Sequence, residues 1–342
     1  MANLSLEQLT YRYDGKLVVD ELDLCVEDNQ IVCLLGASGC GKTTTLKLIA
    51  GLLEPEAGKI VLHQQNVVDE KVFVPAQKRQ VGMMFQDYAL FPHMSVAQNI
   101  AFGLDGLDKK AKTVRVAEML ELVHLVGLGA RYPHELSGGQ QQRVAIARAL
   151  AYKPKLLLMD EPFSNIDSQV RFSLIQEIRA IIKSQGISAI FVSHSKEEAF
   201  AFADYLAVMH EGKILQFGHA QALFSTPVNR KVAEFLGQGI YLAAKRINNN
   251  CVETAFGLIE STNELPPIDD GQIYVRPQYM ALEQSDINTV TIHSGRFLGA
   301  DYAYTIDVEG QSQEVIVPIS AQLDLTRPVS LIIKPHAVNL FA

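Results

Sequence analysis

The sequence predicts an α/β protein of two domains, the first built on a parallel sheet and the second rich in β-strands. The chain has 342 residues, and about 150 residues per domain is typical. Short apolar runs alternate with helical patterns in the first part of the chain, whereas strand-like runs between Gly and Pro dominate the last part. We therefore predict domains at residues 1–238 and 239–342.

In the first domain, apolar runs predict buried strands at Ile31–Leu35, Leu156–Met159 and Ala189–Ser193. A helical pattern over Thr43–Leu53 follows the first of these strands. Strands that alternate with helices indicate a parallel sheet covered on both faces.

The second domain is predicted from strand-like runs at Gln272–Val275, Ala303–Val308, Glu314–Val317 and Val329–Ile333. Turn residues between these runs favour a small β-rich domain, an OB-like barrel. The segment from Tyr241 to Ala342 has six Lys and Arg against twelve Asp and Glu, a net charge of −6 within a total of −8. This acidic balance argues against nucleic acid as a partner.

Composition excludes several classes of protein. Hydrophobic residues make up 48% and charged residues 20%, which is ordinary for a globular protein and unlike a disordered one. No apolar run approaches the roughly 20 residues that span a membrane, and the first ten residues do not resemble a secretory signal. The four cysteines contain no CxxC pair: Cys25, Cys33, Cys40 and Cys251. We therefore expect no disulfide framework or zinc site, as is typical of a reducing cytosol.

The strongest motif is a G-x4-G-K-[ST] phosphate loop between the first predicted strand and helix. The motif and the threonine after it comprise Gly36, Ala37, Ser38, Gly39, Cys40, Gly41, Lys42, Thr43 and Thr44. Its backbone N–H groups and the N-terminus of the following helix bind phosphate. Lys42 supplies a positive charge, and the Thr43 hydroxyl coordinates Mg²⁺. A nucleotide and Mg²⁺ are therefore the expected ligands, and a small packed residue is an alternative role for Cys40.

A second motif is the pair of acids that ends the strand Leu156–Met159. We expect Asp160 to hold Mg²⁺ through its water shell and Glu161 to act as general base beside the attacking water. An acid pair at a strand end is not specific by itself, but it is informative in a chain that also has a phosphate loop.

A second glycine-rich helix start lies between these motifs, at Ser137, Gly138, Gly139 and Gln140. Ser137 is a good N-cap, and the free N–H groups of the helix provide another phosphate site. One nucleotide does not need both sites from one chain. The economical interpretation is a homodimer in which two chains share two nucleotides; a structural cap is the alternative.

The run LSGGQQQR at these positions resembles the signature of ATP-binding-cassette (ABC) ATPases, and other motifs of that family follow in order. The resemblance implies that Tyr13 stacks on adenine, that Gln86 senses the γ-phosphate and its metal, and that His194 is the switch histidine. Residues 164–167 resemble the D-loop, with Ile166 where the family usually has Leu. It implies a P-loop ABC ATPase domain with a helical subdomain, and Lys42, Glu161 and His194 as catalytic residues.

Each of these assignments has a structural alternative. Tyr13 could be an exposed strand aromatic, Gln86 a strand-end amide, and His194 a structural histidine. The family often has Asp after the histidine, where this chain has Ser195, and this leaves the local hydrogen bonding of His194 open.

The segment Lys78–Leu104 resembles importer cassettes served by a solute-binding protein. The resemblance implies a groove that receives a helix of a membrane permease at the cytoplasmic face of the inner membrane, so the chain is peripheral and contacts the binding protein indirectly. The groove residues are Gln86, Asp87, Tyr88, Ala89, Leu90, Phe91 and Pro92; for Leu90 and Phe91, intramolecular packing is the alternative.

Motifs in both domains bear on which solute is imported. Val275, Arg276 and Pro277 resemble a turn in the C-terminal regulatory domain of such importers. The motifs most resemble ferric-iron importer ATPases; polyamine, sugar and sulfate importers are alternatives. More distant alternatives are a soluble ABC ATPase that acts on nucleic acid, an exporter half and a regulatory module without hydrolysis. The second domain could be a sensor or a dimerisation module.

Overall fold

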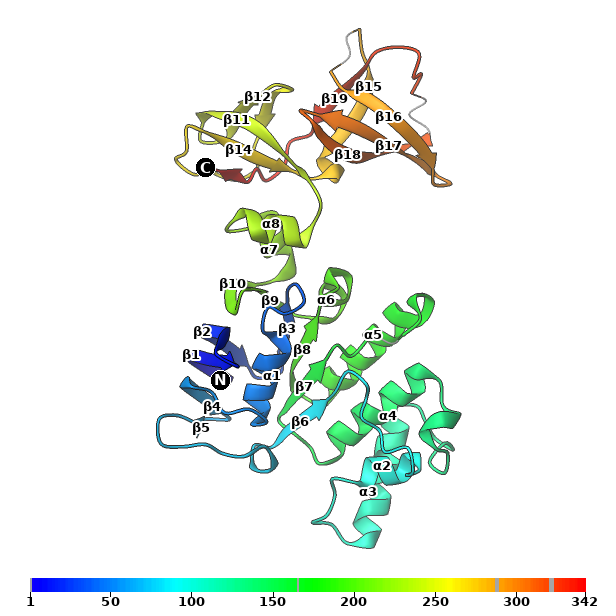
Figure 1. Cartoon of the computed structure of the whole chain (residues 1–342). Helices are drawn as coiled ribbons and strands as arrows, with labels where there is room; N and C mark the ends of the chain where they lie inside the picture. Colours follow the sequence, from blue (N-terminus) through cyan, green and yellow to red (C-terminus); the bar gives the residue numbers. More distant parts are fainter. Residues whose placement is uncertain (1, 165, 287–288, 320–322) are drawn as a thin grey trace. The chain divides into compact units, whose positions relative to one another are not determined.

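The computed structural model in Figure 1 describes residues 2–164, 166–286, 289–319 and 323–342. The chain divides into two compact units, Met1–Ala220 and Gln221–Ala342. Among the described residues, no helix has the length and apolar character needed to cross a membrane.

The first unit is built on a six-stranded sheet in the order β10-β9-β3-β8-β7-β6. Its strands are β3 (Ile31–Leu35), β6 (Val81–Met84), β7 (Leu156–Asp160), β8 (Ser188–Ser193), β9 (Tyr205–His210) and β10 (Lys213–Gly218). Every residue of β3, β7 and β8 is buried. All neighbouring pairs are parallel except β9 and β10, so the prediction of a parallel sheet is confirmed.

The parallel strands bring their carboxyl ends to one edge of the sheet. Leu35 pairs with Ser193, Asp160 with Val192, and Met84 with Met159. The segments that follow β3, β6, β7 and β8 therefore leave the sheet at the same edge, which is where ligands bind in open α/β sheets.

A second, antiparallel sheet in the order β2-β1-β4-β5 adds to the first unit and was not predicted. Its strands are β1 (Ala2–Tyr13), β2 (Lys16–Glu27), β4 (Ala57–Leu62) and β5 (Gln65–Val68). In β2, buried and exposed residues alternate along most of the strand. Such alternation is weaker as a sequence signal than the continuous apolar runs of the central strands.

The helices of the first unit are α1 (Lys42–Ala50), α2 (Val96–Ala101), α3 (Lys109–Leu122), α4 (Gly138–Ala151), α5 (Ser168–Ser184) and α6 (Lys196–Phe202), with 3₁₀ turns η1 (Ala76–Lys78) and η2 (Pro133–Glu135). Helices α2, α3 and α4 pack on one another as a helical subdomain, as Figure 1 shows. The predicted extension of the first helix to Leu53 is wrong, because Gly51 adopts a left-handed conformation (φ 79°) and ends α1.

The second unit is rich in strands, as predicted. It has helices α7 (Ala220–Ser225) and α8 (Arg230–Leu236) and the 3₁₀ turn η3 (Pro277–Tyr279). Its strands are β11 (Ile240–Asn248), β12 (Cys251–Thr254), β13 (Gly257–Glu260), β14 (Asp270–Val275), β15 (Met280–Gln284), β16 (Thr291–Phe297), β17 (Asp301–Val308), β18 (Gln311–Pro318), β19 (Val329–Ile333) and β20 (Leu340–Phe341). The described strands form sheets of five, two and three strands, in the orders β13-β12-β11-β14-β20, β15-β19 and β16-β17-β18.

Helices α7 and α8 are tied to these strands. Arg276, which is buried, donates a hydrogen bond to the Phe224 carbonyl at 3.1 Å, and its guanidinium lies 3.8 Å from the Phe224 ring centroid. The Tyr274 hydroxyl donates to the Gly237 carbonyl at 2.7 Å. These contacts explain why the two helices group with the second unit; the domain boundary after residue 238 stays a prediction.

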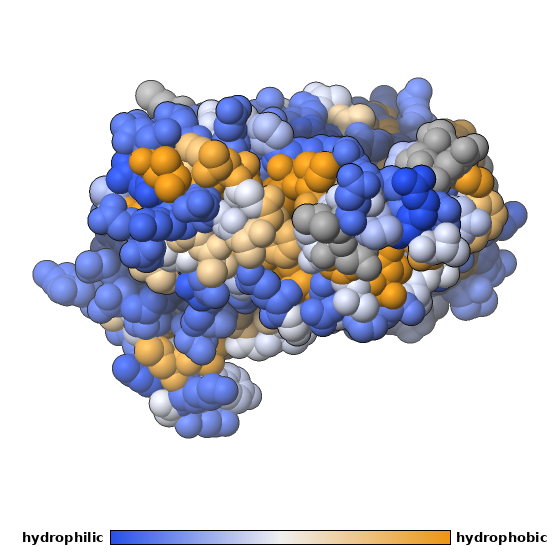
Figure 2. Space-filling view, turned by 90° about the horizontal axis from the view of Figure 1, so that it is seen from above, coloured by the Kyte–Doolittle hydropathy of each residue, from blue (hydrophilic) through white to orange (hydrophobic). Residues whose placement is uncertain are grey.

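The second unit exposes apolar side chains between hydrophilic ones. They include Leu258, Phe297, Ile316 and Leu325. Figure 2 shows such apolar groups on one face of the molecule, within a largely hydrophilic surface. Apolar groups of this kind occur at interaction surfaces when they are contiguous.

The helix that follows the phosphate loop is held at its C-terminus by Arg79. The buried guanidinium donates to the carbonyls of Leu48 at 2.7 Å, Ile49 at 2.8 Å and Val74 at 2.6 Å. Burial lowers the pKa of Arg79 to about 10. Arg79 thus adds a charged donor to two carbonyls in the last turn of α1, where the helix leaves carbonyls free to accept further bonds.

We predict that Arg79→Met lowers the free energy of unfolding of the first unit by about 3 kcal/mol, because buried carbonyls lose a charged donor. Urea unfolding followed by hydrogen exchange measures this change. The control is Arg12→Met, which removes an exposed ion pair with Glu56 and should cost less than about 1 kcal/mol. Equal losses for the two variants would contradict the role of Arg79.

Candidate active site

The phosphate loop follows β3 and surrounds the ammonium group of Lys42. Lys42 is buried, and its Nζ donates hydrogen bonds to the carbonyls of Gly36 at 2.7 Å and Ala37 at 2.9 Å. Gly41 has a φ of 102°, and a Cβ there would lie 2.5 Å from the Val18 carbonyl oxygen. The loop therefore needs glycine at this position, and it holds a positive charge at its centre.

The other residues of the loop differ in exposure. Ala37, Ser38 and Gly39 are exposed, whereas Gly36 and Cys40 are buried, and Thr43 and Thr44 are half-buried. The Cys40 Sγ lies 3.8 Å from the Lys42 Nζ. Cys40 thus packs inside the loop, while its neighbours face solvent, where a phosphate group can approach.

Thr43 and Asp160 come together although 117 positions separate them. The Thr43 hydroxyl donates to Asp160 Oδ1 at 2.8 Å. Burial raises the pKa of Asp160, while the hydrogen bond from Thr43 lowers it and the nearby Glu161 raises it. A hydroxyl and a buried carboxylate are hard oxygen ligands of the kind that Mg²⁺ prefers, so this pair fits the predicted metal.

Glu161 lies directly after β7, between two other predicted site residues. Its Oε2 accepts a hydrogen bond from Gln86 Nε2 at 3.1 Å, and its Oε1 lies 3.3 Å from His194 Nδ1. The three side chains come from the ends of β6, β7 and β8. In this structure Gln86 contacts Glu161, and its role as a metal ligand stays a prediction.

The glycine-rich start of α4 lies apart from the phosphate loop. Ser137 caps the helix in a capping box: its Oγ accepts from the Gln140 N–H at 3.4 Å, and its own N–H donates to Gln140 Oε1 at 3.0 Å. Residues 137–140 line a cavity of about 610 Å³ with Ile166 and Asp167, and no phosphate-loop residue is among its described lining residues. Within one chain, α1 and α4 are well separated (Figure 1).

Two further predictions concern Tyr13 and the D-loop. Tyr13 ends β1 and is 63% exposed, so its ring is available for stacking. In the predicted D-loop, Asn165 lies outside the described residues, and the Ser164 hydroxyl donates to the Glu161 carbonyl at 3.0 Å.

Sequence reasoning missed how the segment after Gln86 is held. Arg148, on α4, donates to the carbonyls of Tyr88 at 2.8 Å and Ala89 at 2.7 Å. The buried Asn99 accepts from the Phe91 N–H at 2.9 Å and donates to its carbonyl at 3.1 Å. The position of Arg148 in the helical pattern does not predict its bonds, because its partners are backbone carbonyls about 60 positions away in the sequence.

Tyr88 departs from the predicted groove. Its side chain is only 3% exposed, and burial raises its pKa to about 12. Tyr88 therefore packs inside the protein, whereas Asp87 and Pro92 are exposed and Ala89, Leu90 and Phe91 are half-buried. The Tyr88 ring is therefore not part of the predicted surface for the permease helix.

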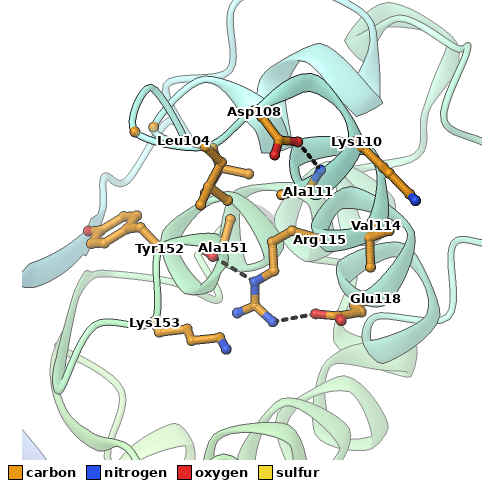
Figure 3. A pocket seen from close by; sticks show the side chains of 13 residues that line it. Leu104, Asp108, Lys110, Ala111, Val114, Arg115, Glu118, Ala151, Tyr152 and Lys153 are labelled. Atoms are coloured by element: carbon orange, nitrogen blue, oxygen red, sulfur yellow. Dashed lines mark hydrogen bonds and ion pairs between the residues drawn. The ribbon is translucent and has the colours of Figure 1, made fainter.

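A cavity of about 700 Å³ lies in the helical subdomain, and Figure 3 shows its lining. Arg115 donates to the carbonyls of Ala151 at 2.7 Å and Leu150 at 2.9 Å and pairs with Glu118 at 2.9 Å. None of the predicted site residues lines this cavity. The candidate site is therefore recognised by its side-chain contacts and not by the size of a pocket.

Comparison with known proteins gives a family match. A family model described as "ABC transporter" matches residues 19–164. The chain is similar to proteins named "Fe(3+) ions import ATP-binding protein FbpC". The protein from Photorhabdus laumondii is 39% identical, and the match covers 90% of this chain and 88% of that protein. The proteins from Brucella melitensis and Escherichia coli O157:H7 are 37% and 36% identical, and each match covers 99% of this chain and 97% of the relative.

A solved structure is also similar: a dimeric ATP-binding cassette, MJ0796, in a post-hydrolysis state bound to ADP and Pi. The TM-score is 0.56 at 26% identity, over 63% of this chain and 98% of that chain.

We predict that Lys42→Ala raises the Kd for ATP by about 10- to 100-fold, because the loop loses the charged donor at its centre. Calorimetry on the full chain measures the affinity. The control is Lys59→Ala, which removes an exposed ion pair with Glu7 and should leave the Kd unchanged. An unchanged Kd in Lys42→Ala would refute the assignment of the loop.

Proposed function

The chain belongs to the family of ABC transporter ATP-binding proteins, and on this premise we propose that it hydrolyses ATP with Glu161 as general base to energise solute import. The observation that supports this role best is the Glu161 carboxylate between Gln86 and His194, at 3.1 and 3.3 Å. Both neighbours restrict the rotation of the carboxylate.

Glu161, Lys42 and the phosphate loop each have a role in the proposed hydrolysis. A water molecule between Glu161 and the γ-phosphate gives its proton to the carboxylate as its oxygen attacks the γ-phosphorus. The bond from this phosphorus to the bridging oxygen breaks, and ADP and inorganic phosphate are the products. Lys42 stabilises negative charge on the phosphate oxygens, and the N–H groups of the loop orient them. Positioning and electrostatic stabilisation account for most catalysis of phosphoryl transfer.

Thr43 and Asp160 are the residues that would hold Mg²⁺, with Gln86 as a further ligand. When bound, the ion neutralises charge on the β- and γ-phosphates. The 2.8 Å contact between the Thr43 hydroxyl and Asp160 supports this assignment.

The signature residues Ser137–Gln140 act on the nucleotide of a second copy of the chain. Their separation from the phosphate loop in one chain and the dimeric state of the similar cassette support a homodimer that closes on ATP. Tyr13, which is exposed, stacks on adenine. In this arrangement each ATP lies between the phosphate loop of one copy and the α4 N-terminus of the other.

The segment from Gln86 to Pro92 contacts a membrane permease, so the chain works at the cytoplasmic face of the inner membrane and reaches the solute-binding protein only through the permease. Arg148 supports this role, since its bonds to Tyr88 and Ala89 link the segment to the signature helix α4. A displacement of α4 on ATP binding therefore reaches the permease contact.

The imported solute is ferric iron. The names of relatives that are 36–39% identical over most of the chain support this choice. Polyamine, sugar or sulfate import would use the same mechanism with another permease. The second unit has a regulatory role, and its exposed apolar groups support an interaction with a protein or a second copy.

We predict that Glu161→Gln lowers kcat for ATP hydrolysis by at least about 100-fold, because the base is lost, while ATP still binds with nearly unchanged Kd. Steady-state assays and calorimetry separate the two effects. Glu118→Gln, at an exposed acid paired with Arg115 in the helical subdomain, is the matched control and should keep wild-type kcat. Wild-type turnover in Glu161→Gln would show that another group is the base.

The solute is tested by isolating the chain from host membranes with its permease and reconstituting the complex. The ATPase rate should rise with the iron-loaded binding protein and not with its iron-free form, because only the loaded form brings the solute to the permease. Stimulation by a polyamine, sugar or sulfate binding protein would overturn the choice of iron alone. Absence of any membrane partner would overturn the importer role.

A further inference from the structure

We propose that Arg171 and Glu198 form a link that positions His194 against Glu161 and ties this position to the D-loop. Arg171 is on α5 and Glu198 on α6. The inference rests on the proposed roles of Glu161 and His194 and adds a positioning function that no catalytic motif contains.

Glu198 holds the backbone on both sides of His194. Its buried carboxylate accepts a hydrogen bond from the Ser193 hydroxyl at 2.8 Å through Oε2, and its N–H donates to the Ser195 hydroxyl at 3.2 Å. The Ser195 N–H in turn donates to the Ser193 Oγ at 2.9 Å. The imidazole of His194 therefore starts from a backbone that Glu198 fixes before and after it.

Arg171 connects Glu198 to the loop that follows Glu161. Its Nη1 lies 3.4 Å from Glu198 Oε1, and its Nη2 donates to the Ile166 carbonyl at 2.8 Å. The Ile166 N–H bonds to the Phe163 carbonyl at 3.3 Å, and Phe163 lies two positions after Glu161. One guanidinium thus contacts both the D-loop and the residue that holds the switch histidine.

These contacts close a ring at the catalytic carboxylate. From Glu161 the chain leads to the Ile166 carbonyl, then to Arg171 and Glu198, then to His194, whose Nδ1 returns to Glu161 Oε1 at 3.3 Å. Ile166 and Asp167 also line the cavity beside the signature residues. A displacement of the D-loop against a second copy would therefore shift His194 through Arg171.

The position of Arg171 is poor for stability alone. A cation in the first turn of a helix opposes the helix dipole, and the buried Nε of Arg171 has no hydrogen-bond partner among the described residues. A partly buried ion pair is also weak evidence for a stabilising role. These costs favour a positioning role, in which the bonds of Arg171 to Ile166 and Glu198 hold the two segments together.

The test compares kcat and KM for ATP of the full chain with those of Arg171→Lys, His194→Ala and the double variant. Lysine keeps the charge but cannot bridge two acceptors as a guanidinium does. We expect Arg171→Lys to lower kcat by about tenfold with unchanged KM. The kcat of the double variant should be no lower than that of His194→Ala alone. Arg171 acts by positioning the imidazole, so its replacement has no further effect once the imidazole is absent.

Glu198→Gln, which keeps an acceptor for Ser193 but loses the charge, should reproduce the loss of Arg171→Lys. The control is Arg179→Lys on the same helix, since Arg179 pairs with Asp204 away from the ring. Arg179→Lys should keep wild-type kcat with a similar change in melting temperature.

Three outcomes would overturn the link. The first is a fold-loss of kcat in the double variant equal to the product of the two single losses. The others are wild-type kcat in Arg171→Lys, or a loss of kcat in Arg179→Lys as large as that in Arg171→Lys. If His194→Ala keeps wild-type kcat, the proposed role of His194 fails as well. A large loss in His194→Ala together with wild-type kcat in Arg171→Lys overturns only the link.

Discussion

The geometry of the site depends on the backbone turn at Glu161. This residue follows a fully buried strand and has a φ of 45°, a left-handed conformation that costs a non-glycine residue about 1–2 kcal/mol. Its N–H bonds to the Val192 carbonyl at 3.2 Å, across to β8. The turn directs the carboxylate toward Gln86 and His194, whereas a continued strand would carry it past them. The strain is therefore stored where the reacting groups must meet.

The central sheet supports this turn. The strands β3, β7 and β8 are entirely buried, while the His194 side chain is 59% exposed and that of Glu161 22% exposed. A rigid frame thus presents reactive groups at its carboxyl edge, where nucleotide and water can reach them. Arg148 on α4 bonds to the backbone after Gln86, and Glu198 on α6 bonds to the serines on either side of His194. Displacements of α4 or α6 would therefore reach these two residues.

Much of this arrangement could be predicted from sequence, because the phosphate loop, Asp160, Glu161 and the Ser137 cap are local patterns with a direct physical meaning. The roles of Arg148 and Arg171 could not, since each lies on a helix and bonds to backbone carbonyls whose positions only the tertiary fold determines. The antiparallel sheet of β1, β2, β4 and β5 was missed for a similar reason, because long-range pairing and not a local apolar run defines it. The early end of α1 depends on Gly51, whose left-handed conformation a helical pattern does not reveal.

In the proposed mechanism, hydrolysis at Glu161 uses two chains, because the residues that line the cavity at the Ser137 helix start include none of the phosphate loop of the same chain. The most direct measurement is the ATPase rate per chain as a function of chain concentration, with mass photometry to report the monomer and dimer. The rate per chain should rise with concentration and follow the dimer fraction at saturating ATP. A constant rate per chain at dilutions where only monomers are present would contradict the shared site.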